Sequence, residues 1–258
     1  MSEVSREFQV WSDLYIDLGG NYHLTFPKCA PYLILAGDIG RLKDYDKYLE
    51  FIKAQTDRFS TVFLVLGNYE YYGGDLRDGR AAAGRLEQEK VLQGKLVVLD
   101  QRRYDVPWTD ITFLGCTLWD PINNPDDEEL AKSQTKDHIE IKGWDKNRHH
   151  ELFLQHVEWL TKQVTEIQEQ DKTAQAKRKI VVISHHPPCF DLDRTLLVFT
   201  SVPKPFNGVH AWVSGHTHSY KRKGSFDFKK TGVHFVSNQQ AHPDCRNVSF
   251  DKEKVITL

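Results

Sequence analysis

The stretch PYLILAGDIG, residues 31–40, decides the fold class. Its apolar half is typical of a buried strand, and its Gly-Asp-Ile-Gly end is typical of a tight turn that displays the carboxylate of Asp38. Because helical patterns flank this stretch, we expect the strand to lie inside a sheet that is covered on both faces. Ligands of such sheets gather where strands end, so Asp38 stands where chemistry usually occurs.

The composition limits the class of protein. The chain has 258 residues, of which 40% are hydrophobic, so it can bury one large core. Its formal net charge of −2 gives no basic footprint for nucleic acid, and no apolar run approaches membrane-spanning length. The 4 cysteines are far apart, and the N-terminus lacks a secretion-signal pattern. We therefore expect a cytoplasmic protein without membrane or sequence-specific nucleic-acid partners; its oligomeric state is left open.

Four more stretches repeat the pattern of an apolar strand that ends in polar residues. They are residues 7–12 before SDLY, 61–66 before GNYE, 179–184 before HHPP and 209–214 before GHTH. Shorter strands are predicted at 95–99, 111–114, 232–237 and 254–258, and helices at 43–59, 80–92 and from residue 151. Strands that alternate with helices indicate βαβ units. We expect one domain over residues 1–258, with a surface or cap insertion at about 119–150.

Six side chains stand within a residue or two of the carboxyl ends of these strands: Asp13, Asp38, Asn68, His185, His216 and His218. Oxygen and imidazole ligands in this mixture suit Zn, Mn or Fe better than Ca. One aspartate can bridge two adjacent metals. Water held between two metals loses its proton near neutral pH, and the same cations neutralise a phosphoryl group.

The series SDLY, GDIG, GNYE, HHPP and GHTH, in this order along most of the chain, resembles the calcineurin-like metallophosphoesterase superfamily. The usual pattern of that superfamily is DxH, GD, GNH followed by D or E, a histidine after a strand, and GHxH. The resemblance implies an α/β fold, a four-layer sandwich of two mixed β-sheets flanked by helices, with a dinuclear metal centre along one edge. It also implies an EC 3.1 hydrolase that cleaves a small phosphorylated or otherwise anionic substrate with a metal-bridging hydroxide.

The resemblance also implies the roles of individual residues. One metal would be held by Asp38, Asn68, His185 and His216, and the other by Asp13, Tyr15, Asp38 and His218. His185 is the expected ligand because it is nearest the strand, and His186 is the reserve. The residues expected to act in catalysis are Asp38, Asn68 and Tyr69. Those expected to bind substrate are Arg41, Tyr69 and His186. Tyr71, Tyr72 and the basic residues 221–223 are further candidates to line the pocket.

Two positions depart from the superfamily pattern, because Tyr15 and Tyr69 stand where it has histidines. The first histidine is a metal ligand in the family. The second helps to bind phosphate and is thought to protonate the leaving group. Tyrosine is a weaker general acid, since its reference pKa is about 10 against about 6.5 for histidine. We therefore expect an enzyme with this pattern to favour esters with good leaving groups.

Three hypotheses remain open. In the first, the protein is a phosphoesterase with two divalent or trivalent ions (Fe, Mn or Zn), and Tyr15 acts as a metal ligand. In the second, loss of a ligand leaves a single-metal or metal-poor degenerate enzyme that acts as a binding protein. In the third, the same scaffold carries out iron-dependent, non-hydrolytic or redox chemistry. Counting the metal ions per chain separates the first hypothesis from the second.

Overall fold

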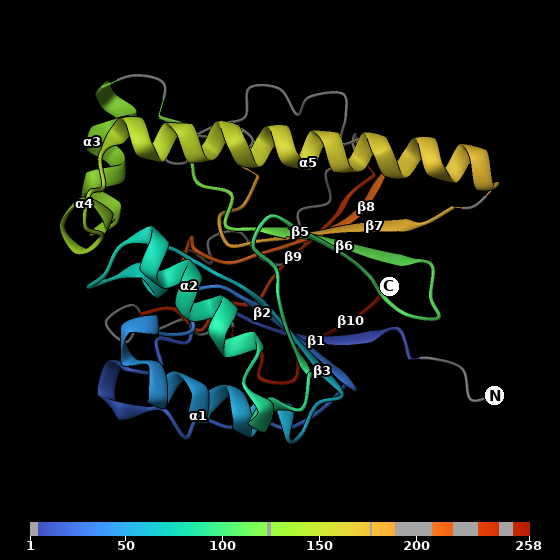
Figure 1. Cartoon of the computed structure of the whole chain (residues 1–258), viewed down its shortest axis with the longest axis horizontal. Coiled ribbons are helices and arrows are strands. Elements are labelled where there is room, and N and C mark those ends of the chain that lie inside the picture. The colour runs from blue at the N-terminus through green and yellow to red at the C-terminus, as the bar shows by residue number, and fades with distance from the viewer. Residues whose placement is uncertain (1–4, 123–124, 176, 189–207, 219–231, 243–249) are drawn as a thin grey trace.

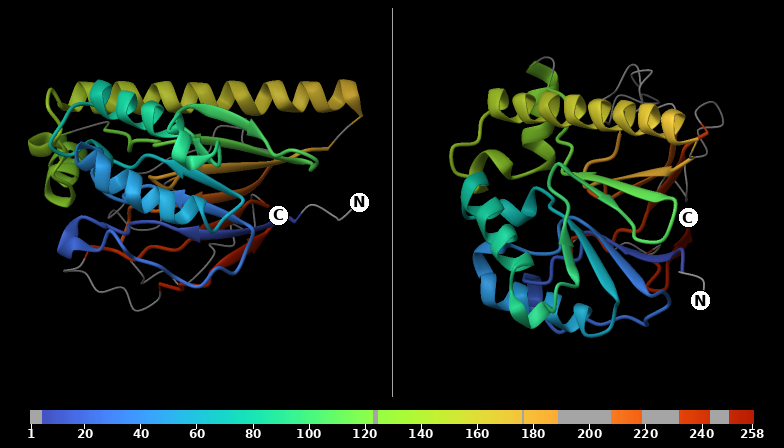
Figure 2. Two further views of the ribbon diagram at one scale, coloured as in Figure 1. Left: turned by 60° about the horizontal axis from the view of Figure 1, so that its bottom comes forward. Right: turned by 45° about the vertical axis from the view of Figure 1, so that its right-hand side comes forward.

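The computed structural model describes residues 5–122, 125–175, 177–188, 208–218, 232–242 and 250–258. Two five-stranded sheets lie face to face, and helices cover their outer faces (Figures 1 and 2). This arrangement confirms the predicted sandwich of two mixed sheets flanked by helices.

The first sheet contains the strand from which the sequence argument began. Its order is β10 (Val255–Thr257), β1 (Glu7–Trp11), β2 (Tyr32–Ala36), β3 (Thr61–Val65) and β4 (Leu96–Val98). Strands β1 to β4 are parallel, and β10 is antiparallel to β1. Strand β2 is therefore central, as predicted, and four of its five residues are buried.

The second sheet follows the order β5 (Arg102–Asp105), β6 (Ile111–Cys116), β7 (Lys179–Ser184), β8 (Val209–Ser214) and β9 (His234–Ser237). Strands β6 to β9 are parallel, and β5 pairs with β6 in the antiparallel sense. The strands β1, β2 and β3 of the first sheet are parallel to one another, and so are β7 and β8 of the second. The polar turns that follow these strands therefore lie at the same edge of each sheet.

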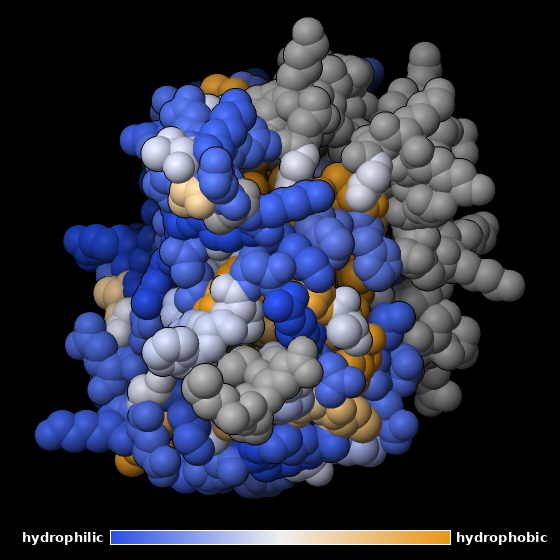
Figure 3. All heavy atoms as spheres, turned by 90° about the vertical axis from the view of Figure 1, so that its right-hand side faces the viewer, coloured by the Kyte–Doolittle hydropathy of each residue, from blue (hydrophilic) through white to orange (hydrophobic). Residues whose placement is uncertain are grey.

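Three apolar clusters hold the layers together. The middle cluster joins the sheets and includes Phe8 and Ile34 from the first and Phe113 and Val181 from the second. One outer cluster packs α1 (Tyr45–Thr56) and α2 (Leu76–Glu87) on the first sheet. The other packs α5 (Lys146–Ala174) on the second. On the face shown in Figure 3, hydrophilic side chains dominate and the larger apolar areas lie toward its centre.

The structure differs from the sequence predictions in four places. Helix α2 spans Leu76–Glu87 and not the predicted 80–92, because the side chain of Asp75 caps its first turn and Lys90–Leu92 form a separate 3-10 helix. Strand β5 was not predicted, because RRYD has no apolar run and lies at a sheet edge. The polar stretch 119–150 contains two helices, α3 (Pro125–Gln134) and α4 (Asp137–Glu140). Helix α5 begins at Lys146, before the predicted start at residue 151, because the side chain of Asp145 caps its first turn. The extent of the domain and the role of 119–150 as an insertion remain predictions.

The long amphipathic helix is confirmed, and its apolar stripe includes a histidine. His156 shares the face of Leu152, Leu160 and Val164, and all four are buried. The Nδ1 atom of His156 accepts a hydrogen bond of 3.0 Å from the backbone of Leu118, so this histidine is part of the packing of the helix. Among the described residues, no helix combines the length and apolar character needed to cross a membrane.

Candidate metal centre

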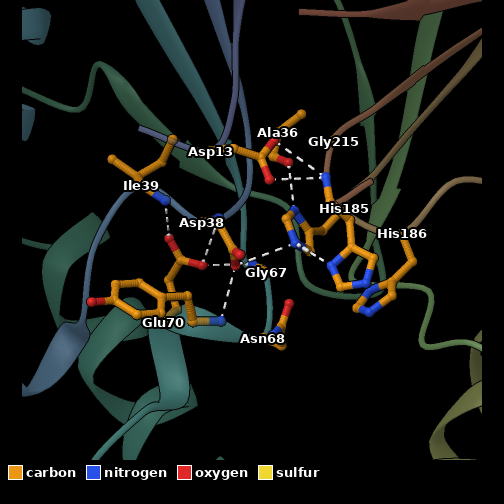
Figure 4. A network of polar contacts seen from close by, with 12 residues as sticks. Asp13, Ala36, Asp38, Ile39, Gly67, Asn68, Glu70, His185, His186 and Gly215 are labelled. Atoms are coloured by element: carbon orange, nitrogen blue, oxygen red, sulfur yellow. Dashed lines mark hydrogen bonds and ion pairs between the residues drawn. The ribbon is translucent and has the colours of Figure 1, made fainter. Parts of the chain in front are cut away.

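Turns from both sheets meet at one edge of the molecule and bring the six predicted side chains together. Figure 4 shows Asp13, Asp38, Asn68 and His185, and the donor atoms of His216 and His218 lie close to those of this set. Two groups of donor atoms are close enough to hold a cation. One consists of His185, His186 and His216, and the other of Asp13, Asp38 and His218. Asp38 also lies against the histidine group, because its Oδ1 is 3.2 Å from His185 Nε2. Asp38 therefore stands between the two groups.

The ring of His185 is fixed in an orientation that suits a ligand. Its Nδ1 lies 2.9 Å from the carbonyl oxygen of Ala36, which can only accept a hydrogen bond. Nδ1 therefore carries a proton in both the neutral and the charged ring, and Nε2, which faces Asp38 and His216, is the nitrogen that could bind a cation after losing its own proton. The distance from His216 Nδ1 to His185 Nε2 is 3.2 Å. Backbone contact through Ala36 thus selects the tautomer that a cation requires.

The second group contains the unusual tyrosine. Asp13 Oδ1 is 3.1 Å from His218 Nε2. The hydroxyl of Tyr15 lies 2.7 Å from Asp38 Oδ2 and 2.8 Å from His218 Nε2. Tyr15 is 5% exposed, and burial together with the charges of Asp38 and Asp13 raises the pKa of its phenol well above the ordinary value. The tyrosine thus contacts the ligand set directly.

Asn68 offers an amide oxygen to the same space. Asn68 Oδ1 is buried and has no hydrogen-bond partner within the described part of the chain. Figure 4 shows the side chain of Asn68 beside Asp38, with its oxygen directed toward the cluster. A buried amide oxygen without a partner is costly unless something binds it. The donor set and this free oxygen together fit the cations that the family pattern implies.

His186 occupies a different position from its neighbour. Its ring packs against that of His216 at a tilt of 35°, with 3.8 Å between centroids, and its Nε2 lies 3.9 Å from Asp120 Oδ2. Its Nδ1 is buried and unpaired among the residues that the structure describes. Burial and the charge of Asp137 raise the pKa of Asp120 to about 7. His186 therefore lies on the side of the histidine group away from Asp38.

Tyr69 and Arg41, the two residues expected to bind substrate from this side, both contact the carboxylate of Asp17. The hydroxyl of Tyr69 donates a hydrogen bond of 2.8 Å to Asp17 Oδ2, and Arg41 Nε lies 2.7 Å from the same oxygen. Arg41 also pairs with Asp44 at 3.3 Å. The backbone N–H of Tyr69 donates to Asp38 Oδ1 at 2.9 Å. Tyr69 thus bonds Asp17 through its ring and Asp38 through its backbone.

Glu70 joins the turns that carry the ligands. Its carboxylate accepts hydrogen bonds from the backbone N–H groups of Asp38, Ile39 and Gly67 at 2.7–2.9 Å, and from the hydroxyl of Tyr48 at 3.2 Å. Burial and the charge of Asp38 raise the pKa of Glu70 to about 7. The sequence motif places Glu70 here, but its role as a clamp between two strand ends emerges only in the structure.

The backbone of the site is strained. Asp13, Tyr15, Asp38, His216 and His218 all have positive φ, between 45° and 72°. Such values are uncommon for residues other than glycine, and each costs on the order of 1 kcal/mol. Gly67 meets a related demand, because a Cβ there would lie 2.2 Å from Asp38 Oδ1. The fold therefore gives up stability to hold these side chains in one place.

Asp38 and His185 form a buried pair of opposite charge. Burial disfavours charge on both groups, but their mutual attraction prevails. The pKa of Asp38 is lowered by His185, and the pKa of His185 is raised to about 10 by Asp38. Without a cation, the positive charge of the protonated imidazole can balance the aspartate.

Four residues near the site were missed by sequence analysis. They are Asp17, Asp120, which lies beside His186 and His216, Asp137, which bonds Asn68, and Gln239, which accepts a hydrogen bond from the backbone of His218. Asp17 and Asp137 belong to no motif of the family pattern, and Gln239 lies just beyond β9. The basic residues 221–223 fall outside the described residues.

Comparison with known proteins gives a family and a shared fold. Residues 23–220 match the family described as calcineurin-like phosphoesterase. An uncharacterized protein of Acanthamoeba polyphaga mimivirus, L509, is 27% identical over 245 residues, which covers 86% of this chain and 82% of the relative.

Two solved structures have the same fold at low identity. The phosphopantetheinyl hydrolase of Mycobacterium tuberculosis aligns with a TM-score of 0.62 at 17% identity, covering 99% of this chain and 97% of that one. A dimetal phosphatase from Danio rerio aligns with a TM-score of 0.51 at 16% identity, covering 90% of this chain and 87% of that one.

Proposed function

Since the chain belongs to the calcineurin-like phosphoesterase family, we propose that it hydrolyses a small phosphorylated substrate at an atypical two-metal centre. The observation that supports this proposal best is the convergence of donors from both sheets. Asp38 contacts His185 from the second sheet, and Asp13 contacts His218. Five motifs that are far apart in the sequence thus supply one compact set of ligands.

The ligands divide into two sets that share Asp38. Asn68, His185 and His216 would complete one set, and Asp13, Tyr15 and His218 the other. Two bound cations would lower the pKa of a water molecule and offset the charge of the phosphoryl group. Every oxygen and nitrogen in these sets belongs to a residue held by backbone or side-chain contacts, so little rearrangement is needed to bind a cation.

The chain's own residues shape the rest of the pocket. Tyr69, Arg41 and His186 are the groups proposed to contact the substrate. Tyr69 bonds Asp38 through its backbone, Arg41 shares the carboxylate of Asp17 with Tyr69, and His186 packs against His216. Arg41 is 29% exposed in its side chain and is balanced by two carboxylates. Its guanidinium would therefore guide an anionic substrate as part of a network and not as an isolated charge.

Hydrolysis assays test the proposal directly. The purified chain, supplied in turn with Mn, Fe and Zn, is expected to cleave aryl phosphate mono- or diesters. Asp38→Asn should reduce that activity by more than about 10²-fold, because it weakens both sets of ligands. Asp126→Asn, on the exposed part of α3, is the matched control and should retain activity. Failure of the wild type with every ester and metal would overturn the proposal.

A second candidate is a binding protein that holds one cation. It is favoured by the contacts of Tyr15, whose neutral hydroxyl bridges Asp38 and His218 at 2.7 and 2.8 Å. In that case the phenol, which donates a hydrogen bond to Asp38 and contacts His218 Nε2, takes the place of the second cation. The two candidates differ in stoichiometry, with about two ions per chain expected for the first and one for the second.

A further inference from the structure

A carboxylate outside the motifs holds the amide of Asn68. Asp137 begins α4 and is 2% exposed. Its Oδ1 accepts a hydrogen bond of 2.9 Å from Asn68 Nδ2 and another of 2.8 Å from the hydroxyl of Tyr72. The Tyr72 oxygen in turn accepts from the backbone of Lys136 at 3.1 Å and lies 3.2 Å from Asn68 Nδ2. Four groups thus form one buried network.

This network distinguishes the two ends of the amide. An ionised carboxylate accepts hydrogen bonds but donates none. If the amide turned over, Asn68 Oδ1 would face Asp137 Oδ1 with no proton between them, and both would be buried. The observed orientation avoids this contact and leaves Asn68 Oδ1, on the side of Asp38, without a hydrogen-bond partner among the residues that the structure describes (Figure 4). Only the oxygen of an amide binds a metal cation well.

The backbone fixes Asp137 relative to the turn that carries Asn68. Gly73 N donates to the carbonyl of Glu140 at 2.8 Å, and Lys142 N donates to the carbonyl of Gly74 at 2.8 Å. These bonds tie the end of α4 to the chain just beyond Asn68. The segment around α4 therefore holds Asp137 in a fixed position beside the turn that carries Asn68.

We propose that Asp137 is a positioning residue that, supported by Tyr72, orients the Asn68 amide so that Oδ1 faces the cation. The inference rests on the proposed function because it assumes that Asn68 is a ligand. Asp137 acts through Asn68 and does not touch the substrate. Neighbours of this kind commonly change metal affinity by 10- to 100-fold.

Metal affinity of the full chain tests the inference without any assay of hydrolysis. Asp137→Asn keeps the shape of the side chain but adds a donor, so the Asn68 amide can adopt either orientation. We expect its Kd for Co²⁺, followed by visible absorption and by calorimetry, to be about 10-fold to 100-fold weaker than that of the wild type. Asp126→Asn, exposed in the same segment, should bind Co²⁺ as the wild type does.

A double-mutant cycle separates positioning from general damage. In an Asn68→Ala chain, adding Asp137→Asn should change the Co²⁺ Kd by less than about twofold, because the residue it positions is gone. Tyr72→Phe, which removes one donor to Asp137, should weaken binding less than Asp137→Asn does. If Asp137→Asn does not fold, as judged by circular dichroism, Tyr72→Phe alone and with Asn68→Ala carries the test.

The outcomes are distinct. The positioning role alone is overturned if a folded Asp137→Asn chain binds Co²⁺ with the Kd of the wild type. It is also overturned if Asp137→Asn weakens Co²⁺ binding equally in the wild-type and Asn68→Ala chains. Tight Co²⁺ binding without hydrolysis of any ester overturns the proposed function alone. A wild-type chain that binds no cation overturns both.

Discussion

The hydroxyl of Tyr69 donates its hydrogen bond to Asp17, at 2.8 Å, and Arg41 shares the same carboxylate oxygen. Burial and Asp17 raise the pKa of the Tyr69 phenol well above its ordinary value. The hydroxyl proton is therefore directed at Asp17, and the position that serves as a proton donor in the family pattern is poorly suited to that task here.

This contact predicts a strong dependence on the leaving group. We expect kcat/KM to fall steeply from 4-nitrophenyl to phenyl to alkyl phosphates, because Tyr69 does not protonate the departing oxygen. Tyr69→His should raise the rate for alkyl esters by at least about 10-fold and change the 4-nitrophenyl rate little. Tyr69→Phe is the control and should keep the wild-type slope. Comparable rates for alkyl and nitrophenyl esters would contradict this account.

Tyr15 should control how many ions the chain holds. Elemental analysis after dialysis is expected to give about two ions per wild-type chain and about one for Tyr15→Phe, because the second set of ligands loses an oxygen. With Fe(III), the wild type should show a visible charge-transfer band that Tyr15→Phe lacks. Tyr104→Phe, in β5, provides the matched control. One ion in the wild type and in Tyr15→Phe alike would favour the single-cation binding protein.

Glu70 should contribute much of the local stability, because it joins two strand ends through three backbone N–H groups. At a pH well above 7, where the Glu70 carboxyl is ionised, we expect Glu70→Gln to lower the free energy of unfolding by about 2–4 kcal/mol in the presence of EDTA, since charged acceptors in buried hydrogen bonds are worth more than neutral ones. Urea denaturation measures this, with the exposed Glu129→Gln as control. A loss below about 0.5 kcal/mol would exclude the clamp.

His156 should make stability depend on pH, because burial lowers its pKa to about 3. Between its unfolded pKa of about 6.5 and this value, the unfolded chain binds a proton that the folded chain does not, so stability falls as pH falls. The wild type should lose about 2 kcal/mol more than His156→Gln between pH 7 and pH 5. The exposed His138→Gln should show no such difference from the wild type. Parallel urea-denaturation curves at both pH values for His156→Gln and the wild type would count against the effect.

The positions of the ligands could be predicted because they depend on local pattern. An apolar run that ends in Gly-Asp or Gly-Asn predicts both a strand and the place where it stops, and parallel strands bring those ends to one edge. The predicted turns at Asp13, Asp38, Asn68 and His185 do follow β1, β2, β3 and β7. The start of α5, in contrast, was predicted five residues too late, although Asp145 is a typical N-cap residue.

The supporting residues could not be predicted in the same way. Asp17 and Asp137 reach the site only because separate parts of the chain pack together, with 52 positions between Asp17 and Tyr69 and 69 between Asn68 and Asp137. A single sequence contains no periodicity that pairs such positions. Strand β5 was missed for a related reason: an edge strand with exposed residues needs its neighbour, not its own side chains, to form.

The convergence of ligands from two sheets has a mechanical consequence. Asp13 follows β1 and His218 follows β8, so a cation bound by both would crosslink segments 205 positions apart. Separating the sheets and releasing the ion would then be a single event, and chelation would lower the melting temperature of the entire sandwich by mass action. Loss of the metal would therefore weaken the contact between the two sheets and not only the loops that carry the ligands.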